Sequence, residues 1–250
     1  MKIDPIRTEK IVVGGPPLLD IIQSTVTECS ERSILVITSK IISLCEGRVV
    51  KIGERDKQSL IKDEASLYIP PEKSKYDISL TITRNILIPT AGIDESNGNG
   101  YYVLWPANPQ QTARDVRAYL ADRFRLTNVG VLITDSKTEP LRLGTSGISL
   151  AYAGFSALKN YIDTPDLFGR NLKVTKANIA DGIAAASVLV MGEGNEQTPF
   201  AMVEDVPFIR FQESMPTAEE LKDLYIPLAD DMYSPLISSA PWEKGKSTDS

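Results

Sequence analysis

Two uninterrupted apolar runs constrain the fold of this chain more than any other feature of its sequence. Residues 33–38 read SILVIT and residues 129–134 read VGVLIT. Neither run alternates between apolar and polar residues, as a strand with one solvated face would. Both are short and rich in β-branched residues, so we predict two strands that are buried on both faces.

Helices and strands are intermixed along the rest of the chain. Apolar periodicity predicts helices over residues 17–29, 56–69, 110–124 and 178–191, and further strands over 48–52, 77–88, 101–105, 147–154, 200–205 and 208–211. Thr217 and Glu220 have the spacing of a capping box and predict a short helix near the C-terminus. This pattern lacks the regular alternation of a Rossmann sheet, so the class is α/β or α+β, and we expect α+β.

The chain is expected to be one catalytic unit over residues 1–250. An alternative division sets residues 138–186 apart as an inserted subdomain, within which residues 163–175 have no regular pattern. The last eight residues, 243–250, are polar and charged and are predicted to be disordered.

Charge and composition exclude several classes of protein. There are 27 Lys and Arg residues against 33 Asp and Glu residues, and no basic face that would indicate a nucleic-acid partner. No apolar run approaches the ~20 residues of a membrane helix, and the opening MKIDPIRTEK lacks the apolar core of a secretory signal. Cys29 and Cys45 are interpreted as buried free thiols, so a cytoplasmic location without a membrane partner is expected.

The chain contains no histidine. This excludes imidazole bases, Ser-His and Cys-His nucleophile pairs, and metal sites with histidine ligands. Two scattered cysteines cannot build a zinc site either. Any metal would be held by oxygen atoms, which favours Mg²⁺, Mn²⁺ or Ca²⁺.

Three polar loops each follow an apolar strand or helix. They are AGIDESN (91–97), TDS (134–136) and GEGNE (192–196). An Asp at the end of a buried strand is a recurrent ligand of the Mg²⁺ that accompanies a nucleotide. Taken singly, such an Asp is as well explained as a turn residue or helix cap, and GEGNE as a solvated loop. Neither a P-loop nor a dinucleotide-binding glycine motif is present.

Positive charge is also needed if phosphates bind among these loops. Lys40 follows the first buried strand, where it is either a surface lysine or a point charge for a phosphate. Arg114 and Arg117 are interpreted as a solvated pair on one helix face. Arg170 lies beside a glycine in a loop and is interpreted as functional.

The order of seven motifs resembles one family. The motifs are ITSKIISLCEGRVV, AGIDESN, LWPANPQQTARDVR, VLITDS, PLRLG, DLFGRNLKVT and IADGIAAASVLVMGEG, and they span most of the chain. The succession is similar to the coenzyme F420-0:L-glutamate ligase family, particularly its bacterial branch of folate-metabolism γ-glutamate ligases. The resemblance implies two unlike α+β subdomains with mixed sheets and an intertwined homodimer. It also implies an enzyme that uses GTP to join the amine of L-glutamate to a substrate carboxylate.

The resemblance assigns roles to individual residues. It implies Asp94, Asp135, Ser136 and Glu193 as metal ligands, with Mg²⁺ or Mn²⁺ as the ion. It implies that the nucleotide contacts Ser39, Lys40, Asn97 and the loop Met191, Gly192, Glu193 and Gly194. The expected catalytic residues are Asp94, Asp135, Lys40 and Arg170.

Some family features are altered, which leaves two choices open. The N-terminal PEI motif is replaced by VVGGPPLLDII, so both GTP and ATP remain candidates. The segment TDSKTEPLR lacks a Gly-Arg pair that the family has beside the expected acceptor region, so the acceptor is left open between a folate, an F420-0-like molecule and another glutamyl conjugate.

The chemistry expected of such a ligase suits a chain without histidine. A carboxylate must be activated before an amine attacks it, and phosphoryl transfer would give an acyl phosphate by positioning and charge neutralisation alone. Two rival hypotheses use the same loops: a metal-dependent phosphohydrolase, and a non-catalytic nucleotide-binding protein.

Overall fold

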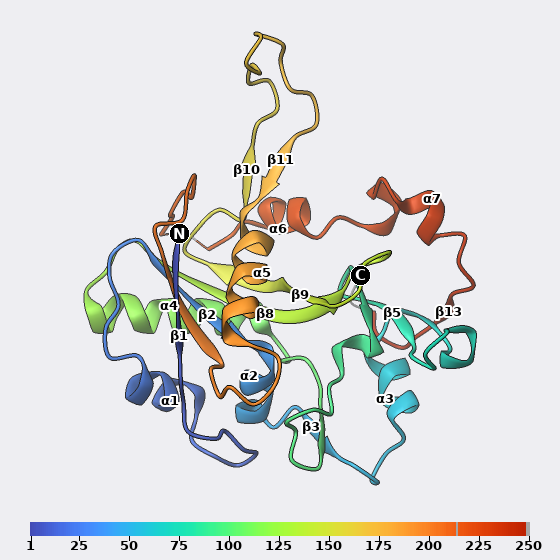
Figure 1. The fold of residues 1–250 in the computed structure, drawn as a ribbon. Helices are drawn as coiled ribbons and strands as arrows, with labels where there is room; N and C mark the ends of the chain where they lie inside the picture. The colour runs from blue at the N-terminus through green and yellow to red at the C-terminus, as the bar shows by residue number, and fades with distance from the viewer. Residues whose placement is uncertain (214, 249–250) are drawn as a thin grey trace.

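A five-stranded mixed sheet forms the centre of the molecule (Figure 1). The computed structural model describes residues 1–213 and 215–248. The strand order is β1 (Lys2–Ile6), β12 (Phe200–Glu204), β2 (Ser33–Thr38), β8 (Val129–Thr138) and β9 (Thr145–Ala153). Only β2 and β8 are parallel, and they are the two apolar runs. The other neighbouring pairs are antiparallel.

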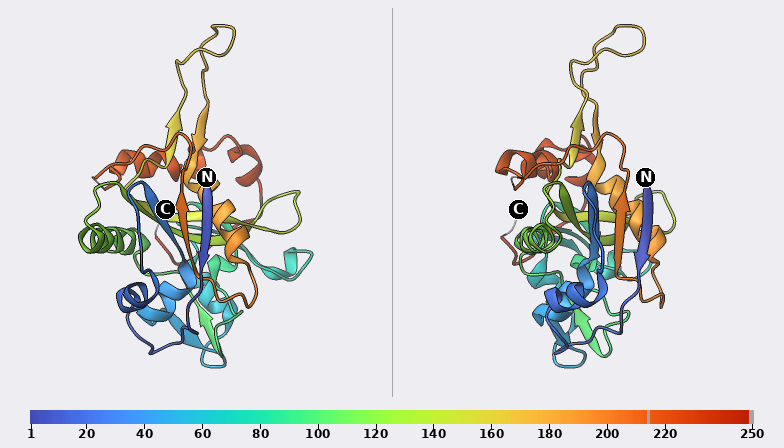
Figure 2. Two further views of the ribbon diagram at one scale, coloured as in Figure 1. Left: turned by 60° about the vertical axis from the view of Figure 1, so that its left-hand side comes forward. Right: turned by 90° about the vertical axis from the view of Figure 1, so that its left-hand side faces the viewer.

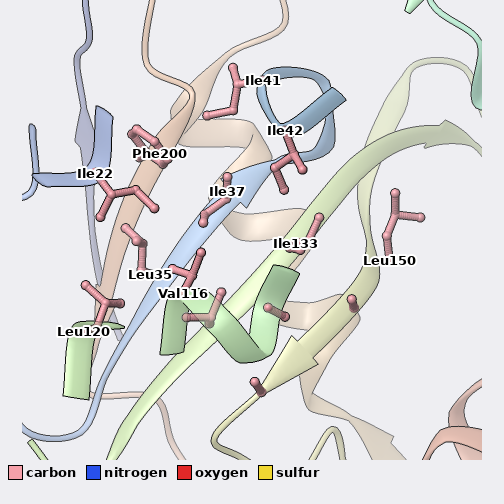
Figure 3. Close-up of a cluster of buried hydrophobic side chains, with 14 of the residues drawn as sticks. Ile22, Leu35, Ile37, Ile41, Ile42, Val116, Leu120, Ile133, Leu150 and Phe200 are labelled. Carbon is pink, nitrogen blue, oxygen red and sulfur yellow. The ribbon is translucent and has the colours of Figure 1, made fainter. Parts of the chain in front are cut away.

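The two apolar runs are buried on both faces, as predicted, because helices cover each side of this sheet. One face packs against α1 (Leu18–Thr25), α2 (Ser39–Glu46) and α4 (Pro109–Phe124), and the other against α5 (Ile179–Met191). Leu35 and Ile37 of β2 enter the first core, which Figure 3 shows between the strands and α4. Ile34 and Val36 enter the second core with α5. All four side chains are fully buried, which explains why the four residues between Ser33 and Thr38 are apolar on both faces of β2.

A smaller unit is built mainly from residues 49–104. Its antiparallel sheet has the order β13 (Glu243–Lys244), β4 (Leu67–Ile69), β5 (Leu80–Thr83) and β6 (Ile86–Pro89). A separate pair joins β3 (Val49–Lys51) to β7 (Tyr101–Val103), and α3 (Lys57–Glu64) packs on a small core of its own. The architecture is therefore mixed α+β, with two unlike larger sheets and, in the described residues, two further two-stranded pairs.

A long arm projects from the body of the protein (Figures 1 and 2). Its base is the antiparallel pair β10 (Leu158–Asn160) and β11 (Lys176–Asn178), and its outer part has no regular structure, as expected for residues 163–175. Residues 138–186 are not set apart as a unit, because β9 completes the central sheet and α5 covers it. Beyond the arm lie α6 (Ala218–Leu224), with the predicted Thr217–Glu220 capping box, and α7 (Ser234–Ile237).

Several predicted elements are wrong in extent. The helix expected over 56–69 ends at Glu64, because the next residues join a sheet as β4. The strand expected over 77–88 is the hairpin β5–β6, which turns at Arg84 and Asn85, both with positive φ. Residues 208–211 make only an isolated bridge at Phe211. The sequence patterns predict none of the strands β1, β10, β11 and β13 and neither of the helices α2 and α7. The described residues also form 3₁₀ turns at Pro71–Lys73, Thr90–Gly92 and Leu228–Asp230.

The prediction of a disordered tail is wrong for residues 243–248, whereas residues 249–250 lie outside the described part. Glu243 accepts a hydrogen bond from the Tyr68 hydroxyl at 2.7 Å, and Lys246 pairs with Asp63 at 2.7 Å. The backbone of Gly245 also donates to the Ser66 carbonyl. These contacts outweigh the polar composition. Over residues 1–213 and 215–248, no helix combines the length and hydrophobicity needed to cross a bilayer.

Candidate active site

The parallel strands β2 and β8 bring Lys40 and Asp135 to one edge of the central sheet. They pair in register from Ser33 opposite Val129 to Thr38 opposite Thr134. Lys40 lies in α2, just after the end of β2. The prediction of a loop at residues 134–136 is wrong, because β8 continues to Thr138 by pairing with β9, so Asp135 lies within the strand, one residue past the last one paired with β2. A cleft of about 800 Å³ opens here, and its lining includes Lys40, Asp94, Asn97, Asp135, Ser136 and Glu193.

Asp94 lies in a tight loop that its own side chain stabilises. One carboxylate oxygen accepts the backbone N–H groups of Glu95 and Ser96, at 2.6 and 2.9 Å, and the Ser96 hydroxyl at 2.9 Å. The other oxygen lies 2.5 Å from Nζ of Lys40. Burial favours the neutral acid, but the hydrogen bond and charge of Lys40 outweigh it and lower the pKa of Asp94 below its ordinary value.

The pKa of Asp135 is shifted in the opposite direction from that of Asp94. Burial raises its pKa to about 6, although the Trp105 indole and the Ser136 backbone N–H both donate toward its carboxylate. The charge of Asp94 raises the pKa of Asp135 further, and the charge of Lys40 lowers it. The negative charge of Asp94 therefore disfavours ionisation of Asp135 in the same cleft, and the positive charge of Lys40 does not offset this effect together with the cost of burial.

The third loop is joined to the other two by side-chain hydrogen bonds. Glu193 accepts the hydroxyl of Ser136 at 2.7 Å and that of Thr145 at 3.2 Å. Asn97 donates through Nδ2 to the carbonyl of Gly194 at 2.9 Å. Segments that are some 50 to 100 residues apart in the chain thus contact one another around the cleft.

Glu196 occupies the inner side of the glycine loop. Its Oε2 accepts the N–H of Gly194 at 2.8 Å, and a Cβ on Gly192 would lie 2.5 Å from its carboxyl carbon. Gly192 also has a φ of +82°, which other residues rarely adopt. The loop is therefore shaped to hold an anionic oxygen against its backbone, and in this structure the carboxylate of Glu196 is that anion.

Two predicted site residues lie outside the cleft. Ser39 is 3% exposed at the start of α2, so its side chain is buried while Thr38 and Lys40 on either side line the cleft. Arg170 is exposed on the projecting arm, where its backbone bonds with Asp166, and it does not reach the cleft of its own chain.

Three contributors to the site were not anticipated. The segment from Thr8 to Val12 lines one side of the cleft, Glu196 fills the glycine loop, and Trp105 bonds to Asp135. Trp105 stands in the motif LWPANPQQ, but nothing local indicates that its ring reaches a strand 30 residues further on. Glu196 is part of GEGNE, and only the fold-back of that loop distinguishes it from Glu193.

The donor atoms of the cleft are compatible with an oxygen-preferring divalent ion. Asp94, Asp135 and Glu193 offer carboxylate oxygens and Ser136 a hydroxyl. In residues 1–213 and 215–248, no three acidic, histidine or cysteine side chains are close enough together to enclose an ion on their own. Mg²⁺ suits such a partial set, because it commonly keeps several waters and takes one or two carboxylates together with substrate phosphates.

Comparisons with known proteins agree with the motif resemblance. The family model for F420-0:Gamma-glutamyl ligase matches residues 5–205. The coenzyme F420:L-glutamate ligase of Methanopyrus kandleri is 29% identical over 220 residues, or 80% of this chain and 84% of the relative. The enzyme of the same name from Archaeoglobus fulgidus is 30% identical over 219 residues, which cover 81% of this chain and 87% of the relative. That from Methanosarcina mazei is 27% identical over 230 residues, which cover 83% and 88%. Because the family model covers most of its length, the chain belongs to the F420-0:Gamma-glutamyl ligase family.

Proposed function

We propose that this protein joins the amine of L-glutamate to a carboxylate of its acceptor in a reaction that consumes GTP or ATP and requires Mg²⁺ or Mn²⁺. Membership of the family makes the chain a ligase that forms a γ-glutamyl amide bond. The nucleotide, the metal and the acceptor are the parts that we add.

One observation supports these additions more than any other. Three segments from distant parts of the chain, residues 91–97, 134–136 and 192–196, line a single cleft of about 800 Å³ and carry carboxylates, a hydroxyl and a glycine-rich backbone. The start of α2 adds Lys40 to the same cleft. This set suits a nucleoside triphosphate with its metal, because it combines oxygen ligands for the ion, a cation for the phosphates and backbone N–H groups that phosphate oxygens can approach closely. The cleft is also large enough for a small-molecule ligand.

Asp94, Asp135, Ser136 and Glu193 would hold the metal, which when bound supplies charge neutralisation to the phosphates. Lys40 lines the cleft and its Nζ lies 2.5 Å from the Asp94 carboxylate. In this proposal, the ammonium group moves from Asp94 to a phosphate oxygen when the nucleotide binds. The glycine loop receives phosphate oxygens where Glu196 now lies. Transfer of the γ-phosphoryl group to the acceptor carboxylate gives an acyl phosphate and leaves the nucleoside diphosphate. Attack by the glutamate amine on the acyl carbon then forms the amide, with loss of a proton from the amine, and releases phosphate.

The acceptor is proposed to be an F420-0-like molecule, because the relatives are named for coenzyme F420. A folate is the second candidate, and it rests on the sequence resemblance alone. A homodimer is also part of the proposal. Leu167 and Phe168 on the arm are 98% and 94% exposed, which is unusual for large apolar side chains unless a second surface covers them.

Mass spectrometry of reaction products tests the proposal. The protein is incubated with L-glutamate, GTP or ATP, Mg²⁺ or Mn²⁺, and either an F420 precursor or a folate. We expect one acceptor to gain the mass of a glutamate residue, with phosphate released only when glutamate and acceptor are both present. Asp135→Asn is the matched inactive control. Phosphate release that needs neither glutamate nor acceptor would contradict the ligase and favour the phosphohydrolase.

A further inference from the structure

The indole of Trp105 lies between two of the loops that form the cleft. The side chain is 3% exposed, and its Nε1 donates a hydrogen bond to Oδ2 of Asp135 at 2.5 Å. The same edge of the ring faces Gly92, just before Asp94. A Cβ on Gly92 would lie 2.2 Å from Cε2 and 2.3 Å from Nε1 of the indole. Gly92 therefore makes room for the atom that bonds Asp135.

The backbone holds Trp105 in the same relation to Asp94. Asp94 and Val103 exchange two backbone hydrogen bonds, at 3.0 and 2.8 Å, only two residues before the tryptophan. The carbonyl of Trp105 accepts the Nε of Arg48 at 3.1 Å. One short segment is thus bonded to Asp94 through its backbone and to Asp135 through its side chain.

An indole is well suited to orient a carboxylate that binds a metal. Its N–H can donate but not accept, it carries no charge, and it does not compete for the ion. By bonding Oδ2 it restricts the rotation of the Asp135 carboxylate, so that Oδ1 remains available to a ligand. Partners of this kind fix the direction of metal ligands, and removing them typically weakens metal binding by about 10–100-fold.

We propose that Trp105 is a positioning residue that aligns Asp135 with the Asp94 loop for binding of a divalent cation. This rests on the proposed function in one respect, namely that the cleft binds such a cation. The inference adds a residue that holds the two carboxylates in a fixed relation and itself contacts neither metal nor substrate.

The chain supplies a matched control for the test. Its only other tryptophan, Trp242, also donates its indole N–H, to the carbonyl of Ile237 at 2.6 Å, and it does not line the cleft. Trp105→Phe and Trp242→Phe each remove one indole and one hydrogen bond. Binding of Mn²⁺ alone to the full chain is measured at pH 7.5 from the electron paramagnetic resonance signal of the free ion. We expect the Kd to rise about 10–100-fold in Trp105→Phe and to stay unchanged in Trp242→Phe.

Fluorescence provides a second measurement that leaves Trp105 in place. In Trp242→Phe all tryptophan emission comes from Trp105, and a paramagnetic Mn²⁺ ion bound beside Asp135 should quench it. We expect quenching to reach half its maximum at the Kd found by resonance. In Trp105→Phe the emission of Trp242 should not respond at the same Mn²⁺ concentrations. The measurement on Trp242→Phe does not depend on whether Trp105→Phe folds, and circular dichroism checks the folding of Trp105→Phe separately.

Two outcomes would overturn the role of Trp105 without affecting the ligase proposal. One is an equal Mn²⁺ Kd in folded Trp105→Phe and Trp242→Phe, and the other is bound Mn²⁺ with no change in Trp105 emission. A wild-type chain that binds no Mn²⁺ would overturn this inference and the metal requirement together. Failure to detect a glutamylated product, with the Mn²⁺ results as expected, would count against the ligase proposal alone.

Discussion

Replacing Asp135 with Asn should stabilise the metal-free protein at neutral pH. Burial raises the pKa of Asp135 from 3.8 to about 6, so ionising this carboxyl costs more in the folded chain than in the unfolded chain. A shift of this size corresponds to about 3 kcal/mol at roughly 1.4 kcal/mol per unit. Because the Asp135 side chain keeps some contact with solvent, which screens its charge, we expect Asp135→Asn to raise the free energy of unfolding by about 2 kcal/mol at neutral pH. Asn keeps an oxygen that can accept the Trp105 hydrogen bond.

The sign of the effect depends on pH. The folded-state pKa of Asp135 lies above the unfolded value, so its favourable contribution is complete below about pH 4 and is lost as the pH rises through about 6. The difference in unfolding free energy between Asp135→Asn and the wild type should therefore be near zero at pH 4 and reach about 2 kcal/mol at pH 7.5. Urea unfolding of both chains in EDTA at several pH values measures it. A difference that is independent of pH, or a variant less stable at pH 7.5, would refute the reasoning.

Two controls sharpen this experiment. Asp94→Asn should do the reverse, since Lys40 lowers the pKa of Asp94, so this carboxylate stabilises the fold above the unfolded pKa and ceases to do so in acid. The Asn variant should thus be less stable than the wild type at pH 7.5 and similar to it at low pH. Saturating Mn²⁺ should stabilise only the wild type, by about 2.7 kcal/mol at one hundred times its Kd.

Two further substitutions test the geometry of the cleft. Gly92→Ala should destabilise the protein by about 2–5 kcal/mol in urea unfolding, because it adds a clash with Trp105 to the strain of a positive φ. Gly100→Ala has a similar φ and open space around it, so a loss of only about 1–2 kcal/mol is expected, and equal losses would argue against the clash. Lys40→Gln should lower nucleotide turnover about 100-fold or more, since one charge at a transferring phosphate contributes about 3 kcal/mol. Lys57→Gln, which removes a 3.4 Å pair with Glu95 and a cation–π contact with Tyr102, should leave turnover unchanged, and equal effects would show that Lys40 acts as a surface charge.

The central sheet could be predicted from the sequence because its signal is local. SILVIT and VGVLIT have apolar residues on both faces over most of their length, and both form interior strands of the central sheet, buried on each side. The helix predicted over 56–69 is present but ends early, at Glu64, for a non-local reason. Its last residues, Leu67–Ile69, have partners in β5 and β13, the second of which lies about 175 residues away. Tertiary pairing of this kind overrides local periodicity.

The candidate site was predictable in its parts and not in its connections. Asp94, Asp135 and Glu193 were identified from strand and helix ends, and the fold brings them to one cleft. The contacts that join them, such as Asn97 to the Gly194 carbonyl and Trp105 to Asp135, depend on how three loops stack. No spacing in the sequence encodes that stacking. Ser39 was misplaced for a simpler reason, because α2 begins directly at the end of β2 and turns that side chain inward.

The in-register pairing of β2 with β8 has a consequence for how such a protein can vary. Thr38 faces Thr134 across the sheet, and the residues that follow them supply a cation and an acid to opposite sides of the cleft. Inserting one residue into either strand would slide its end by about 3.3 Å and reverse which way each later side chain points. Surface loops such as the arm can lengthen or shorten freely, whereas the lengths of these two strands are locked together. Relatives that keep this chemistry should therefore show no gaps within either strand.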